Sequence, residues 1–263
     1  MKWLEIAPDV FVRRYAELDL SVGLVVGAES ALVIDTRGDH QQGSELADAV
    51  RQVTALPWQV AITHGHFDHC FGTDAFLPAP VWAQERCPAY LAATADEQRG
   101  QWVAHYQREG HPEIAAALAD SVPTTPDRLV PERADLDLGG RTVQLRHLGL
   151  GHTDHDLVIA VPDAGVVFAG DLVEQGAPPD FGDSHPEHWP STVDALLALD
   201  PITVVPGHGG PVDHAFVRTQ HAELTQLAVA CREYRTGRAS WDQAVRRSPF
   251  PADTTRDALR RVR

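Results

Sequence analysis

The sequence predicts an α+β fold in which two β-rich halves pack their sheets together and helices cover the outer faces. Short apolar or alternating runs, separated by Gly and Ser, are typical of strands, and longer segments with helical spacing interrupt them. The halves also share a weak internal repeat. In each, a strand ending in an acid precedes a helix and then a strand that ends in a histidine loop, as in LVIDT to WQVAITHGH and VVFAGD to ITVVPGHG.

The first half begins with strands and adds one clear helix. Residues 42–55 have helical spacing, because Leu46, Ala49 and Val50 share one face, and Pro57 ends the segment. The run 58–63 is short and apolar, as in a buried strand. The other expected strands are Val10–Tyr15, Val22–Val26, Ala31–Ile34 and Val81–Ala83.

We expect the whole chain, residues 1–263, to form one domain with two helical additions. Residues 84–121 are rich in Ala, Gln and Glu and predict a helical insertion, while residues beyond 214 predict a helical tail. Between them we expect hairpins at 136–147 and 157–169, a helix at 191–199 and a strand at 203–205.

The charge and the apolar content of the sequence indicate which kinds of partner the protein can bind. The net charge of −15 repels phosphate backbones and anionic lipids, which argues against nucleic acid and membrane partners. No apolar run approaches the roughly 20 residues that span a bilayer, and the first residues lack an apolar signal core. We therefore expect a cytoplasmic protein that acts on a small molecule; the sequence does not indicate its oligomeric state.

The strongest chemical signal is the string His64-Gly-His66-Phe-Asp68-His69, which directly follows the expected strand 58–63. Alternate side chains of extended backbone point the same way, so His64 and His66 can reach one metal together. Asp68 and His69 follow where the chain turns, and can face a neighbouring metal. Zinc accepts both imidazole nitrogen and carboxylate oxygen.

Three further segments supply matching ligands. His152 and His208 lie in glycine-flanked loops, Gly149–Thr153 and Pro206–Gly210, and Asp171 ends an apolar strand. Each segment alone is a weak signal, because such residues are common in turns. Together with the first string they supply the seven ligands that two metals need.

The sequence resembles the metallo-β-lactamase superfamily over about residues 10–215. The resemblance rests on THGHFDH, GHT, AGD and PGHG, in that order, and on Asp35 at a strand end. It implies a four-layer αββα sandwich of two mixed β-sheets with the metals at one edge. His64, His66 and His152 would then hold one metal, Asp68, His69 and His208 the other, and Asp171 would bridge them. Asp35 would support the ligand loop by a hydrogen bond.

The resemblance also implies a zinc-dependent hydrolase with two zinc ions, although iron or manganese would fit the same ligands. Two cations roughly 3.5–4 Å apart share a water, lower its pKa and create a bridging hydroxide near neutral pH. Asp68 is the expected catalytic residue, orienting this hydroxide. The true zinc β-lactamases carry Cys where this chain has Asp171, so the pattern is closer to the glyoxalase II-like and lactonase-like branches. A small ester, thioester or lactone is the expected substrate.

Other functions remain open on the sequence. An iron-dependent sulfur dioxygenase of the same superfamily would use one iron, and metal analysis separates it from the hydrolase. A phosphodiesterase or nuclease is disfavoured by the acidic charge. A metal-binding protein without catalysis is disfavoured by the complete set of ligand types. A flavodiiron-type reductase would need Glu in place of His66 and a flavin domain.

Weaker signals surround the expected site. Cys70 lines the site or, more often for such a residue, fills the core. Asp156 either orients His152 through a hydrogen bond or begins the next strand. The loop 178–185 could contact substrate, and the aromatic residues of the insertion, Trp102, His105 and Tyr106, could form a lid or pack in the core.

Overall fold

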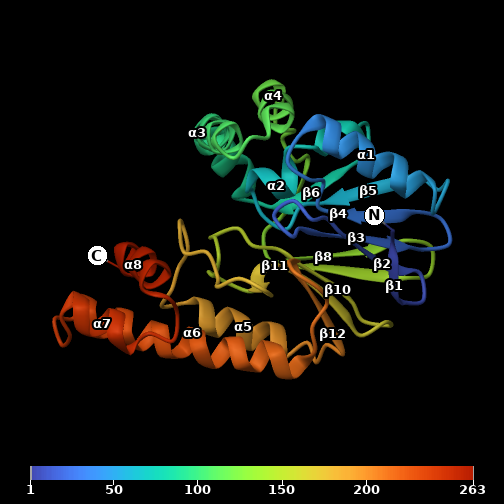
Figure 1. Cartoon of the computed structure of the whole chain (residues 1–263). Helices are drawn as coiled ribbons and strands as arrows, with labels where there is room; N and C mark the ends of the chain where they lie inside the picture. Colours follow the sequence, from blue (N-terminus) through green and yellow to red (C-terminus); the bar gives the residue numbers. More distant parts are fainter. Residues whose placement is uncertain (1, 263) are drawn as a thin grey trace.

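Two β-sheets lie face to face between two layers of helices in the computed structural model, which describes residues 2–262. In Figure 1, helices α1–α4 cover one side of the paired sheets and α5–α8 the other. The predicted α+β, four-layer αββα sandwich is therefore the fold of this chain.

The first sheet has seven strands in the order β1-β2-β3-β4-β5-β6-β7. Strands β1 to β4 pair antiparallel, while β4 to β7 pair parallel. Their bounds are β1 (Leu4–Ala7), β2 (Val10–Arg14), β3 (Ser21–Val26), β4 (Ala31–Ile34), β5 (Trp58–Ala61), β6 (Val81–Gln84) and β7 (Arg128–Val130).

The second sheet has five strands in the order β12-β11-β10-β9-β8, with only β11 and β12 parallel. Their bounds are β8 (Arg133–Asp137), β9 (Thr142–Arg146), β10 (Val158–Val161), β11 (Val166–Glu174) and β12 (Thr203–His208). Both sheets thus mix parallel and antiparallel pairs.

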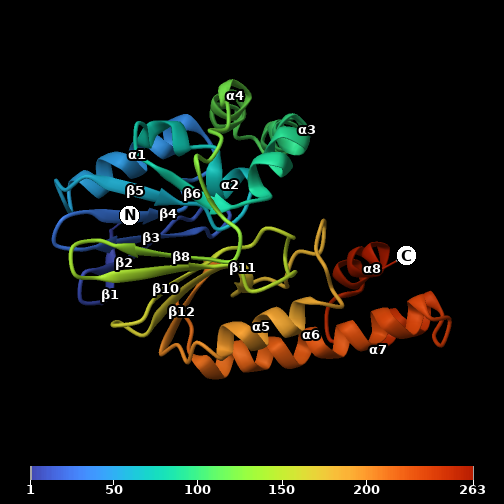
Figure 2. The same cartoon turned by 180° about the vertical axis from the view of Figure 1, so that it is seen from behind.

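The helices divide by half of the chain, as the two opposite views show (Figures 1 and 2). On the first sheet lie α1 (His40–Arg51), α2 (Phe67–Cys70), the 3-10 turn η1 (Thr73–Phe76), α3 (Cys87–Arg108) and α4 (Pro112–Asp120). On the second lie α5 (Trp189–Leu197), α6 (His214–Arg235), α7 (Trp241–Arg247) and α8 (Ala252–Arg261).

Strand β4 shows why the apolar runs of the sequence are continuous rather than alternating. All four of its side chains are buried, because helices cover one face of its sheet and the second sheet covers the other. Leu32 and Ile34 belong to the core between the sheets, where they join Leu145 and Phe168. Val33 faces the helices instead.

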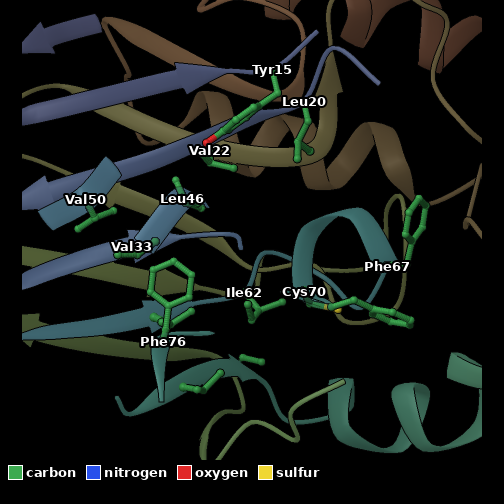
Figure 3. Packing of buried hydrophobic residues seen from close by; sticks show 14 of the residues in the cluster. Tyr15, Leu20, Val22, Val33, Leu46, Val50, Ile62, Phe67, Cys70 and Phe76 are labelled. Atoms are coloured by element: carbon green, nitrogen blue, oxygen red, sulfur yellow. The ribbon is translucent and has the colours of Figure 1, made fainter. Parts of the chain in front are cut away.

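The outer cores fix the helices on the sheets. Figure 3 shows the first of them, where Val33 and Ile62 pack with Leu46 of α1, Phe67 of α2 and Phe76 of η1. A corresponding cluster holds α5 to α8 on the second sheet. One core between the two sheets and one between each sheet and its helices thus hold the four layers together.

The internal repeat predicted from the sequence has a structural counterpart. Units β4–α1–β5 and β11–α5–β12 each join two parallel neighbouring strands through a helix. Asp35 and the two histidine loops lie at the carboxyl ends of β4, β5 and β12. Asp171 was expected to end its strand but lies within β11, because this strand continues to Glu174.

Sequence reasoning missed strands β1 and β7 and the short helix α2. Helices α3 and α4 occupy the range of the expected insertion, with a break at residues 109–111, and α6 to α8 occupy the expected tail. Cys70 is buried in the core beside Phe67, as the filler interpretation predicted. Among residues 2–262, no helix is both long and apolar enough to cross a membrane.

Candidate metal centre

The seven expected ligands converge at the carboxyl ends of β5 and β12, around the middle of β11. His64 and His66 directly follow β5, and helix α2 then presents Asp68 and His69. Asp171 lies within β11, His208 ends β12, and His152 lies in the loop between β9 and β10. Residues more than a hundred positions apart thus meet in one place.

Four side chains form the first group, which is His64, His66, His152 and Asp171. His66 Nδ1 lies 3.0 Å from the Nε2 atoms of both His64 and His152. The carboxylate of Asp171 lies 3.6 Å from His64 Nε2 and 3.7 Å from His152 Nε2. One nitrogen of each ring and one carboxylate oxygen therefore surround a common point.

Asp68, His69 and His208 form the second group. The two imidazole Nε2 atoms are 3.3 Å apart, and Asp68 Oδ2 lies 3.4 Å from that of His208. Asp171 reaches this group as well, because its oxygens lie 3.3 Å from both His69 Nε2 and His208 Nε2. The structure thus places Asp171 between the two groups, where the resemblance predicted a bridge.

The outer ring nitrogens show which inner nitrogens carry no proton. His208 Nδ1 lies 2.7 Å from the carbonyl of Leu18, and His152 Nδ1 lies 3.3 Å from that of Asp180. A carbonyl accepts only, so both Nδ1 atoms donate, and in the neutral rings both Nε2 atoms carry a lone pair that can bind a cation.

The other three rings follow the same rule. His69 Nδ1 donates to Asp35 at 2.8 Å, and His66 Nε2 donates to Asp183 at 3.3 Å. His64 Nδ1 lies 3.1 Å from the hydroxyl of Thr63, which itself donates to Asp35, so this ring donates too. In their neutral forms, all five imidazoles therefore direct a lone pair into the two ligand groups.

Such lone pairs repel one another unless a cation lies between them, so the donor set fits metal ions. An orphaned atom gives the same indication: Asp171 Oδ1 is buried and has no hydrogen-bond partner. Gly207 keeps this carboxylate in place by having no side chain, because a Cβ there would lie 1.8 Å from Asp171 Oδ1.

The electrostatics of the two groups differ. In the first group, burial lowers the pKa of His64 well below its usual value, and burial with nearby His66 lowers the pKa of His152. Burial also opposes charge on His66, but the hydrogen bond to Asp183 and the charges of the nearby carboxylates together outweigh it and raise the pKa of this ring. In the second group burial also works against a charged ring, but the Asp171 and Asp68 carboxylates outweigh it and raise the pKa of His208 to about 10. Both rings of the second group therefore favour positive charge, whereas in the first group only His66 does.

Asp35 and Asp156, both expected to support the ligands, take different positions. Asp35 accepts hydrogen bonds from His69 Nδ1 and from the amide and hydroxyl of Thr63, so it touches the first ligand loop as expected. Asp156 accepts from the amide and hydroxyl of Thr153 and does not contact the His152 ring. Of its two interpretations, the bond to His152 is wrong, because Thr153 lies nearer and offers two donors.

Sequence reasoning missed the supports that come from the connection 175–188. The carbonyl of Asp180 and the carboxylate of Asp183 hold His152 and His66 respectively. The only signal was the position of this acidic loop shortly after Asp171. Which acid would reach which ring could not be read from the order of residues.

A cavity of about 660 Å³ opens over both groups. His66, Asp68, Asp171 and His208 lie at its wall, so the candidate metal centre faces it directly. Helix α3 and the connection 175–188 form other parts of the wall. Trp102 of α3 both lines the cavity and packs against Phe67, with ring centroids 4.5 Å apart.

Comparisons with known proteins agree with this geometry. The family model of the Metallo-beta-lactamase superfamily matches residues 17–208, which include all seven ligands. The chain is 26% identical over 196 residues to the type 2 metallo-beta-lactamase of Bacillus cereus, covering 72% of this chain and 67% of the relative. A type 2 metallo-beta-lactamase of Bacteroides fragilis is 29% identical over 115 residues, 40% of this chain and 46% of the relative. The chain thus spans about two thirds or less of these relatives.

Solved structures share the fold. A metallo-beta-lactamase from Pontibacter korlensis superimposes with a TM-score of 0.66 at 21% identity, covering 85% of this chain and 98% of the other. FIM-1 from Pseudomonas aeruginosa, in its mono-zinc form, gives a TM-score of 0.65 at 16% identity, covering 87% and 96%. At these identities the likeness concerns the fold alone.

Proposed function

Because the chain belongs to the metallo-beta-lactamase superfamily, we propose that it is a zinc-dependent hydrolase with a binuclear centre that cleaves a small ester, thioester or lactone. The observation that carries the proposal is the convergence of five inward-facing imidazole nitrogens and two carboxylates beside a cavity. His64, His66 and His152 would hold one cation, Asp68, His69 and His208 the other, with Asp171 between them.

Cations bound there would lower the pKa of a water molecule and polarise a carbonyl. The protein contributes position and solvent exclusion. Asp35 and the backbone carbonyls of Leu18 and Asp180 fix three rings, so that little reorganisation is needed during reaction. Asp68 is buried yet lines the cavity, where its carboxylate can orient an attacking water.

The relatives named above are β-lactamases, but the resemblance seen in the sequence favours another substrate. The zinc β-lactamases carry Cys where this chain has Asp171, which replaces a thiolate ligand by a carboxylate. We therefore place the chain nearer the glyoxalase II-like and lactonase-like branches. A small molecule fits the volume of the cavity, and we propose a cytoplasmic location, testable by cell fractionation.

The proposal is tested by quantifying metals in the purified protein and by assaying lactones, thioesters, phosphodiesters and a β-lactam. We expect about two zinc equivalents and hydrolysis of at least one acyl substrate. Iron together with oxygen uptake would instead identify a sulfur dioxygenase. Protein without bound metal, inactive on the whole panel after zinc is added, would refute the proposal.

Asp68→Asn separates catalysis from folding. We expect kcat to fall roughly 100-fold or more, because the amide removes the negative charge beside His69 and His208, while the thermal unfolding curve changes little. The control is Asp120→Asn, which alters an exposed carboxylate at the end of α4 and should leave kcat unchanged. Unaltered turnover in Asp68→Asn would remove Asp68 from the mechanism.

A further inference from the structure

The cavity over the metal centre has an acidic wall. Apart from the expected ligands, Asp19, Glu97, Glu174, Asp180 and Asp183 line it. Asp19 is paired with Arg14, and burial together with nearby Asp171 raises the pKa of Glu174 to about 8, so these two add little negative charge near neutral pH. Glu97, Asp180 and Asp183 remain as carboxylates facing the cavity.

No Lys or Arg lines this cavity in the part of the chain that the structure describes. Lys2 is the only lysine of the sequence and lies far from the ligands in order. Two arginines near the start and the middle of α3 have other partners: Arg86 donates to the carbonyl of Asp154 and Arg99 to that of Ser121. A carboxylate on a substrate would find no cationic side chain there to bind it.

One part of the wall is apolar. Trp102 lies against Phe67, and Leu18 and Ala177 also line the cavity. Aromatic and aliphatic side chains of this kind bind uncharged carbon chains by removing apolar surface from water. The amide side chains of Gln98 and Gln101 complete this region without adding charge.

We propose that this cavity selects acyl groups that are uncharged beyond the reacting carbonyl, and that it rejects acyl groups bearing a second carboxylate. The observations that carry this are the facing carboxylates, the apolar wall and the lack of a basic lining residue. The inference rests on the proposed function for the position of the reacting carbonyl.

A matched pair of metal-binding ligands tests this selection without requiring turnover. Hexanohydroxamate ends in a methyl group, whereas the monohydroxamate of adipic acid has the same chain length and ends in a carboxylate. Calorimetry on the zinc-loaded protein should give at least about ten-fold tighter binding of the uncharged ligand. Equal or tighter binding of the carboxylate ligand, or no binding of either, would overturn the inference.

Reversing one charge on the wall should change the selection. Glu97 is exposed on α3 and lies outside the expected ligands, and Glu97→Lys gives the carboxylate ligand a partner. We expect its affinity to rise about ten-fold, with that of hexanohydroxamate within about two-fold of its original value. Glu109→Lys makes the same change at the exposed end of α3, away from the cavity, and should alter neither affinity.

The outcomes separate this inference from the proposed function. Kinetics on p-nitrophenyl hexanoate and the mono-p-nitrophenyl ester of adipic acid should show the same preference in kcat/KM. If the protein binds the uncharged hydroxamate more tightly but hydrolyses neither ester, the proposed hydrolase function is refuted and the proposed selectivity of the cavity is supported. If both esters are hydrolysed with equal kcat/KM, the hydrolase function is supported and the proposed selectivity of the cavity is refuted.

Discussion

The two ligand groups share Asp171 but differ in what holds their histidines. In the first group, the outer nitrogens of His66 and His152 are bonded to the irregular connection 175–188. In the second, the outer nitrogens of His69 and His208 are bonded to Asp35, at the end of β4, and to the carbonyl of Leu18 before β3. Two rings of the first group are thus held by the connection after β11, whereas both rings of the second are held by residues that flank strands of the first sheet. His64 is the exception in the first group, because Thr63 links it to Asp35.

The two carboxylates that support these histidines differ in how far they are exposed to solvent. The side chain of Asp35 is 2% exposed and lies 2.8 Å from His69, whereas that of Asp183 is 32% exposed and lies 3.3 Å from His66. Water can replace an exposed carboxylate as a hydrogen-bond acceptor but cannot reach a buried one. The comparison indicates that the second group is set by the fold, while the first is completed by the position of the connection.

The largest expected effect is on the second group, through Asp35→Asn. The single carbonyl oxygen of Asn cannot serve the three donors that Asp35 accepts, and Asn tolerates the local φ of 62°. Affinity for one of two cations should fall roughly 10- to 100-fold in a competitive zinc titration. Because Asp35 also accepts from Thr63, which contacts the His64 ring, affinity for the other cation should fall by a smaller factor. An equal loss of affinity for both cations would contradict the comparison.

The same substitution at Asp183 should have a smaller effect, on the first group. The amide oxygen of Asn can still accept from His66 Nε2, and water reaches this position. We expect a loss of affinity for the other cation of at most about ten-fold. The two Asp→Asn variants are matched, so a greater loss at Asp183 than at Asp35 would reverse the comparison.

The smallest expected effect lies furthest from the ligands, at Arg261 in α8. This guanidinium donates to the carbonyl of Asp183 at 2.9 Å and to that of Ser184 at 3.1 Å, and so ties the connection to the last helix. Arg261→Ala should lower the affinity of the first group for its cation about two- to five-fold and leave the affinity of the second group unchanged. Arg260→Ala, which loses only a pair with Asp257, is the control, and an equal effect in both variants would assign the change to α8 as a whole.

The sequence predicted the elements and ligands whose geometry is local or periodic. His64 and His66 alternate on extended backbone, and Asp68 and His69 lie on the short turn that follows, so their spacing already constrains their directions. The buried strands around them were visible as apolar runs. Strands β1 and β7 were missed because their side chains are largely exposed and give no apolar run.

The supports of the ligands could not be predicted, because they depend on packing between distant residues. Asp183 reaches His66 across 117 positions, and Arg261 reaches Asp183 across 78. The carbonyl of Leu18 carries no side-chain signal at all. Asp156 illustrates the same limit at short range, since the choice between Thr153 and His152 depends on the exact path of one loop.

His208 lies where the second sheet contacts the residues that lead into β3 of the first. It pairs with Leu20 in an isolated β-bridge, and the neighbouring Gly209 is bonded to Asp19 and Ser21. Each ligand group also draws members from both halves of the chain. Any cation held by either group would therefore act as a cross-link between the halves, and a fragment comprising one half alone would possess neither complete group.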